Sequence, residues 1–269
     1  MAERAIGIFD SGVGGLTVLK ALREVLPAER LYYLGDTARV PYGTKSSGTV
    51  LRYAQEAAGF LVRHRVKMLV VACNTASAVA IEAVEQRFNL PVIGVIEPGA
   101  RRAAAVTRNG RVGVIGTEGT VRSGAYSRAI RALDERIEVF AAPCPLFVPL
   151  VEEGWGEHEV ASLVAREYLA PLIDRGIDTL VLGCTHYPLL KATLQRVLGA
   201  NVTLVDSATE TAQLVASLLG KRLVLRRGEA CAPRYFVTDE PTRFKRVGGA
   251  FVGVELGDVT QVDLGRAHG

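Results

Sequence analysis

Short apolar runs alternate along the chain with longer segments in which apolar residues recur every three or four positions. The short runs have the length of buried strands, and the longer segments follow the period of an amphipathic helix. The first four strands predicted in this way are residues 6–9, 31–34, 68–72 and 92–96. The helices predicted between them are about residues 16–26, 46–65 and 75–88. This alternation predicts a parallel sheet that is covered by helices on both faces.

The same order of elements begins again near residue 112. The second set of predicted strands is 112–116, 137–141, 179–183 and 202–205, and the helices are 120–133, 158–175, 188–198 and 209–219. Three matching strand segments begin at residues 6 and 112, 69 and 180, and 92 and 202, so their separations are 106, 111 and 110 residues. Because these separations are nearly equal and in order, we expect two similar doubly wound α/β domains related by pseudo-symmetry.

The last part of the chain, from residue 207, is about 60 residues long, which is short for a segment that forms its own hydrophobic core. Residues 233–238 and 250–254 are predicted strands on either side of a short helix. We therefore expect the tail to return to the first unit. The predicted first domain is 1–97 plus 207–269, the second is 98–206, and the active site lies in the cleft between them.

The composition is that of a globular protein, with 49% hydrophobic and 22% charged residues among 269. No run approaches the roughly 20 apolar residues of a membrane span. Residues 1–9 lack a signal-peptide pattern. We expect a cytoplasmic protein with no membrane partner, and its four cysteines should be reduced there.

Charge and cysteine spacing exclude further classes of function. The net charge is only +4, and the nearest approach to a basic patch is Lys221, Arg222, Arg226 and Arg227. We interpret this patch as a solvated strand edge and expect no nucleic-acid partner. No Cys-x-x-Cys pair occurs, so neither a zinc site nor a redox motif is indicated.

Cys73 and Cys184 stand at matching positions of the two passes, each directly after a predicted strand and before a predicted helix. Ligands of open α/β sheets bind beyond the carboxyl ends of the strands, and a helix N-terminus there favours a thiolate. A lone cysteine is more often a small buried apolar group, which is how we interpret Cys144 and Cys231.

Two thiols that face each other across a cleft suit the inversion of a carbon centre. A base on one face removes a proton and an acid on the other face delivers one. Because two close thiolates repel, one thiol and one thiolate is the favoured state. The polar residues that follow each cysteine, Asn74-Thr75 and Thr185-His186, suit a bound carboxylate.

Four motifs resemble those of the glutamate racemase family, and the resemblance covers nearly the whole chain, including residues 236–238. The motifs are residues 10–15 (DSGVGG), 41–43 (PYG), 72–76 (ACNTA) and 183–188 (GCTHYP). The resemblance implies interconversion of L- and D-glutamate without a cofactor or metal, in a homodimer that supplies D-glutamate for peptidoglycan.

The resemblance also implies roles for individual residues. Cys73 would exchange the α-proton of D-glutamate with the help of Asp10, and Cys184 that of L-glutamate with the help of His186. Glu152 is similar to the family's second acidic helper, and the adjacent Glu153 leaves that assignment open. The residues that would hold the substrate are Asp10, Ser11, Pro41, Tyr42, Gly43, Asn74, Thr75, Thr117, Thr120, Thr185 and His186.

Other interpretations remain at this stage. Asp10 is also a suitable helix cap, and His186 a suitable structural group. A nucleotide-binding fingerprint would need glycine at 17, where Thr17 stands. The alternative functions are racemisation of aspartate or another amino acid, and a non-catalytic binding protein whose two lobes close on a ligand.

Overall fold

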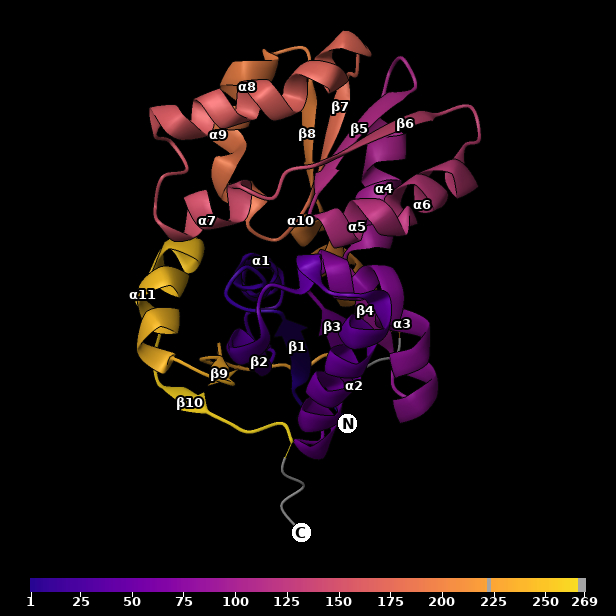
Figure 1. Cartoon of the computed structure of the whole chain (residues 1–269). Coiled ribbons are helices and arrows are strands. Elements are labelled where there is room, and N and C mark those ends of the chain that lie inside the picture. Colours follow the sequence, from indigo (N-terminus) through magenta and orange to yellow (C-terminus); the bar gives the residue numbers. More distant parts are fainter. Residues whose placement is uncertain (222–223, 266–269) are drawn as a thin grey trace.

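The computed structural model describes residues 1–221 and 224–265 and contains two parallel sheets, one in each of two units that lie one above the other (Figure 1). The lower sheet has the strand order β10-β9-β2-β1-β3-β4. Its strands are β1 (Ile6–Asp10), β2 (Leu31–Gly35), β3 (Met68–Val71), β4 (Val92–Gly94), β9 (Arg234–Val237) and β10 (Val259–Gln261). The other elements of this unit are α1 (Leu16–Val25), η1 (Thr37–Arg39), η2 (Tyr42–Thr44), α2 (Ser47–Arg63), α3 (Asn74–Phe88), α10 (Ser207–Lys221) and α11 (Pro241–Val252).

The upper sheet repeats the central part of the lower one, with the order β6-β5-β7-β8. Its strands are β5 (Arg111–Gly116), β6 (Glu138–Pro143), β7 (Thr179–Gly183) and β8 (Thr203–Asp206). The other elements are α4 (Ile96–Val106), α5 (Glu118–Ser123), α6 (Ala125–Leu133), α7 (Phe147–Glu152), α8 (Glu159–Asp174), η3 (Tyr187–Leu190) and α9 (Lys191–Leu198). The predicted fold class, two similar parallel-sheet α/β units, is therefore confirmed, and β5 and β7 correspond to β1 and β3.

The central strands β1, β3 and β7 are apolar except for Asp10 at the end of β1 and Thr179 at the start of β7, because helices cover both faces of each sheet. Every residue of β1, β3 and β7 is buried. Two helices connect the units: α4 leaves the lower sheet and packs on α6 and β7, while α10 leaves the upper sheet and packs on α1. We propose the division into 1–97 plus 207–269 and 98–206 on the basis of these packing partners.

Two predicted helices differ in detail. The helix expected over 120–133 is divided into α5 and α6 at Gly124, whose φ of 64° is left-handed and suits glycine. The segment 188–198 begins as the 3-10 turn η3 and becomes α-helical only at Lys191. The pattern also missed α4 and α7.

The tail adds strands to the lower sheet, because β9 pairs with β2 and β10 pairs with β9. The prediction of a strand at 250–254 is wrong, since α11 continues to Val252. The reason is the spacing of Phe244, Val247 and Phe251, which places three buried side chains on one helical face. The true last strand is β10, a short segment with only one half-buried residue.

Of the basic residues near 221–227, the described ones, Lys221, Arg226 and Arg227, do not lie on a strand, so the strand-edge interpretation is wrong for them. Residues 224–227 form an irregular segment, in which Arg226 pairs with Glu3 and donates to the carbonyl of Ala28. Lys221 ends α10, and Arg222 lies outside the described residues.

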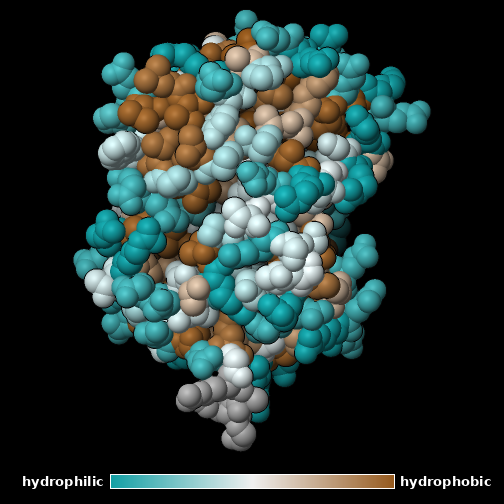
Figure 2. Space-filling model, viewed as in Figure 1, coloured by the Kyte–Doolittle hydropathy of each residue, from teal (hydrophilic) through white to brown (hydrophobic). Residues whose placement is uncertain are grey.

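The exterior of the upper unit carries a group of apolar side chains. Figure 2 shows them over α8, where Val160, Leu163 and Ile173 are 36%, 53% and 44% exposed. Within the described residues, no helix is long and apolar enough to cross a membrane.

Candidate active site

The loops at the carboxyl ends of β1 and β7 touch, which brings the two units together at the candidate site. A Cβ atom added to Gly14 would lie 2.2 Å from Thr185 Oγ1 and 2.5 Å from His186 Nδ1. Thr185 Oγ1 also donates a 3.4 Å hydrogen bond to Asp10 Oδ1. Only a glycine at position 14 permits this approach, which explains one glycine of the first motif without any nucleotide.

Cys73 lies at the N-terminus of α3 with its side chain buried, and its Sγ is 3.7 Å from Ser11 Oγ. Burial and the nearby Asp10 carboxylate raise the pKa of Cys73 to about 12. The helix N-terminus alone predicts the opposite direction, but in this enclosed site desolvation outweighs it. Cys73 is therefore a neutral thiol at neutral pH.

Asp10 is completely buried at the end of β1. Its Oδ2 accepts a 2.9 Å hydrogen bond from the backbone N–H of Gly12. Burial raises the pKa of Asp10, while the nearby His186 and the backbone N–H groups of the loop act against that rise. The carboxyl group therefore shapes the loop as a cap would, and it also contributes negative charge next to Cys73.

Cys184 precedes η3 and faces the imidazole of His186, whose other ring nitrogen contacts the carboxylate of Glu152. Its Sγ is 3.9 Å from His186 Nδ1, and His186 Nε2 is 3.0 Å from Glu152 Oε1. Burial disfavours a charged His186, but the contacts with Cys184 and Glu152 prevail and raise its pKa to about 10. Of the two adjacent acids, Glu152 contacts His186 and Glu153 is exposed at the end of α7.

Glu152 is also held from its other side. Its Oε2 lies 2.8 Å from Arg243 Nη2 on α11. Burial acts to raise the pKa of Glu152, but hydrogen bonds with His186 and Arg243 lower it overall. An ionised Glu152 and a protonated His186 therefore form a charged pair behind Cys184.

Polar donors converge from both units. Asn74 Oδ1 accepts a 2.7 Å hydrogen bond from Tyr126, and its buried Nδ2 has no partner among the described residues. The hydroxyls of Thr75, Thr117 and Thr120 lie 2.9–3.2 Å from one another. This cluster joins the start of α3 to the loop after β5.

Some predicted contacts are less direct. Pro41 is exposed, and the phenol of Tyr42 donates its hydrogen bond to Asp36. Gly43 packs tightly on the second unit, since a Cβ there would lie 2.6 Å from Thr117 Cβ. The motif at 41–43 thus contributes its backbone, while its aromatic side chain fixes the loop.

The remaining cysteines fit structural roles. Cys144 is completely buried and its thiol contacts the carbonyl of Ala142, while Cys231 is half-buried in the segment before β9. No group of three or more His, Cys, Asp or Glu side chains suited to a metal occurs among the described residues.

Sequence reasoning missed Tyr126, Arg243 and Asp36, which support Asn74, Glu152 and Tyr42. Each lies far in sequence from the group that it contacts or outside the recognised motifs, as with Glu152 and Arg243, which are 91 positions apart. A signal for them would require knowledge of the fold.

Comparison with known proteins agrees with the geometry. The family model described as Asp/Glu/Hydantoin racemase matches residues 6–215. The glutamate racemase of Geobacter metallireducens is 61% identical over 98% of both chains, and that of Chlorobaculum tepidum is 49% identical over 98% of this chain and 97% of its own.

Solved structures show the same likeness. Glutamate racemase from Francisella tularensis, in complex with D-glutamate, has a TM-score of 0.93 at 39% identity and covers 98% of this chain and 99% of its own. The Thermus thermophilus enzyme has a TM-score of 0.88 at 47% identity and covers 98% of each chain. The chain therefore belongs to the Asp/Glu/hydantoin racemase family and is an amino-acid racemase of the glutamate racemase type.

Proposed function

We propose that this racemase interconverts L- and D-glutamate by two-base proton transfer between Cys73 and Cys184, without a cofactor. The observation that carries the proposal is the pair of buried thiols at equivalent positions after β3 and β7, in two units that touch through Gly14 and Thr185. Each thiol has its own polar partner, Ser11 for Cys73 and His186 for Cys184.

The reaction from L-glutamate balances with these groups alone. The Cys184 thiolate takes the α-proton to become a thiol, and the electron pair of the broken C–H bond moves into the substrate carboxylate. The Cys73 thiol then delivers its proton to the opposite face of the α-carbon and becomes a thiolate. This product state is the reactant state for D-glutamate, so the two directions use the same groups in reverse.

The two cysteines have different polar surroundings. Cys73 is held as a thiol because burial and Asp10 raise its pKa to about 12. His186 Nδ1 lies 3.9 Å from the sulfur of Cys184, where it can assist proton transfer at that thiol. A thiol at Cys73 is the form that protonation of the second face requires when L-glutamate is the substrate.

The substrate's carboxylates would bind the converging donors. A buried N–H without a partner is costly, and a carboxylate oxygen at Asn74 Nδ2 would relieve that cost. The threonine cluster of Thr75, Thr117 and Thr120 offers hydroxyl donors next to it. The related Francisella tularensis enzyme was solved with D-glutamate bound, which supports glutamate over other amino acids.

We further propose that the enzyme works in the cytoplasm as a homodimer and supplies D-glutamate for peptidoglycan, as its family resemblance implies. The exposed apolar side chains of α8, Val160, Leu163 and Ile173, offer a surface that a second copy would bury. Sedimentation should show a dimer that Leu163→Glu weakens, and a monomer at all concentrations would contradict this part.

The test of function is incubation of the purified protein with L-glutamate in the absence of pyridoxal phosphate. Chiral chromatography should show conversion to an equal mixture of enantiomers. Cys73→Ser and Cys184→Ser should each nearly abolish it, whereas Cys144→Ser should not. Aspartate converted with a higher kcat/KM than glutamate would reassign the substrate, and racemisation that survives both active-site serines would refute the mechanism.

A further inference from the structure

Helix α11 contacts both Glu152 and His186, the two side chains next to Cys184. At its start, Arg243 Nη2 lies 2.8 Å from Glu152 Oε2. Near its end, the ring of Phe251 meets His186 edge-on, with 5.2 Å between the ring centroids. One helix therefore touches the carboxylate and the imidazole together, and Figure 1 shows α11 directly beneath α7.

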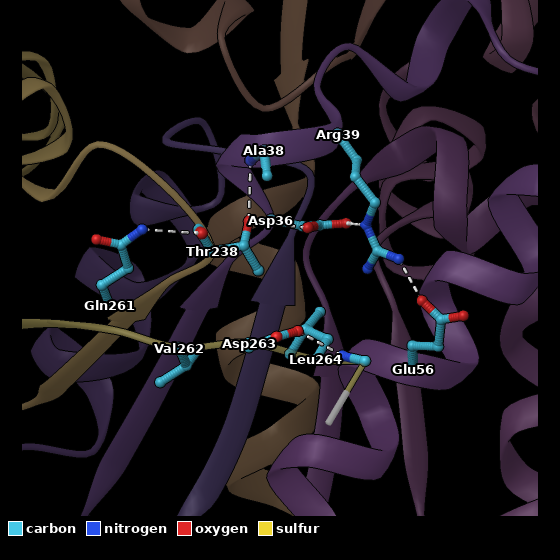
Figure 3. A pocket seen from close by; sticks show the side chains of 10 residues that line it. Asp36, Ala38, Arg39, Glu56, Thr238, Gln261, Val262, Asp263 and Leu264 are labelled. Carbon is cyan, nitrogen blue, oxygen red and sulfur yellow. Dashed lines mark hydrogen bonds and ion pairs between the residues drawn. The ribbon is translucent and has the colours of Figure 1, made fainter. Parts of the chain in front are cut away.

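The start of α11 is anchored to the lower unit through the loop after β2. Thr37 Oγ1 donates to the carbonyl of Asp239 and accepts from its backbone N–H. Thr238 Oγ1 donates a 3.0 Å hydrogen bond to Asp36, which in turn binds Arg39 Nε at 2.7 Å. Figure 3 shows these hydrogen-bonded residues, Thr238, Asp36 and Arg39, lining a surface pocket. Neither Cys73 nor Cys184 lines that pocket.

We propose that Arg243 is a positioning residue for the proton transfer at Cys184. Glu152 uses Oε1 for His186 and Oε2 for Arg243, and its side chain is 14% exposed. Without Arg243 the carboxylate is free to turn toward water and leave the imidazole. The inference rests on the proposed function, in which His186 acts on Cys184.

A consequence follows for the two units. Arg243 belongs to an element anchored on the lower sheet, and Glu152 ends a helix that packs on η3 and α8 of the upper unit. The ion pair between them therefore forms only when the units are together. This makes the acid–base step at Cys184 depend on their contact.

The test is Arg243→Met, which removes the charge and keeps an extended side chain. We expect kcat/KM for glutamate to fall on the order of tenfold, the loss of one charged hydrogen bond. The kinetic isotope effect with α-deuterated L-glutamate should rise, because Cys184 removes that deuteron in the slowed step. With α-deuterated D-glutamate it should fall, because Cys73 removes that deuteron in the unaffected step.

Two further variants separate positioning from general damage. Arg246→Met makes the same change at an exposed site of the same helix, where no ion pair with the described residues occurs, and should leave both isotope effects as in wild type. Arg243→Lys should recover most of the lost activity. A folded Arg243→Met protein with both isotope effects unchanged, or both shifted in the same direction, would overturn the inference. If the wild-type enzyme incorporates no solvent deuterium at the α-carbon of glutamate in D2O, that result would instead refute the proposed function on which the inference rests.

Discussion

The contact between the loops after β1 and β7 can be tested with a single methyl group. Gly14→Ala places a Cβ atom 2.2 Å from Thr185 Oγ1 and 2.5 Å from His186 Nδ1. Because ordinary contacts begin at 3.4 Å, one side of the contact must move by about 1.2 Å. The backbone of Gly14 does not have a left-handed φ, so the alanine itself is not strained.

Displacement of this size acts directly on the group that faces Cys184. A misplacement of about 1 Å can cost about 100-fold in rate, so we expect kcat for glutamate racemisation to fall by about that factor. Overpacking should also lower the free energy of unfolding by about 1–3 kcal/mol. Steady-state kinetics and urea unfolding measure the two effects separately.

The matched control is Gly48→Ala near the start of α2, where a Cβ meets nothing within 4 Å. This variant should keep full activity and should not lose stability, because alanine favours a helix over glycine. A Gly14→Ala enzyme with wild-type kcat would refute the view that the two loops meet in the working enzyme.

Two other predictions concern buried charges. Because folding raises the pKa of His186 from a usual 6.5 to about 10, its contribution to the free energy of unfolding is complete below about pH 6.5 and is lost as the pH rises through 10. Urea unfolding of wild type and His186→Asn should therefore converge between pH 6 and 10.5, and a pH-independent difference would contradict this. The side chains of Lys67 and Glu29 form a 2.6 Å ion pair and are each 1% exposed. Lys67→Met should lower the free energy of unfolding by about 3–5 kcal/mol, because it leaves the buried Glu29 carboxylate without its counter-charge. The double variant Lys67→Met with Glu29→Leu should recover much of that loss. A single variant as stable as wild type would count against the pair.

The sequence pattern predicted what depends on local periodicity. The fully buried strands β1, β3 and β7 carry polar residues only at an end, Asp10 in β1 and Thr179 in β7, so their positions and the placement of Cys73 and Cys184 after β3 and β7 follow directly. The error at 250–254 arose because a five-residue apolar run is equally compatible with a strand or with the last turn of a helix.

The rest depends on contacts between distant segments. Arg243 is 46% exposed on α11, and nothing around it in sequence distinguishes it from other surface arginines. The raised pKa of Cys73 follows from its burial in the tertiary fold and from the nearby Asp10, whereas its position in the sequence shows only the helix N-terminus. Local hydrophobic periodicity does not predict which distant residues come into contact in the tertiary fold.

The central claim is that the proton on the product's α-carbon comes from a different group than the one that removed the substrate's proton. The direct measurement is the isotope content of D-glutamate formed from ordinary L-glutamate in D2O at low conversion. We predict deuterium at the α-carbon of essentially every D-glutamate molecule, while the remaining L-glutamate keeps its hydrogen. D-glutamate that retains the original α-hydrogen would contradict the account, because a single base would then have carried it from one face to the other.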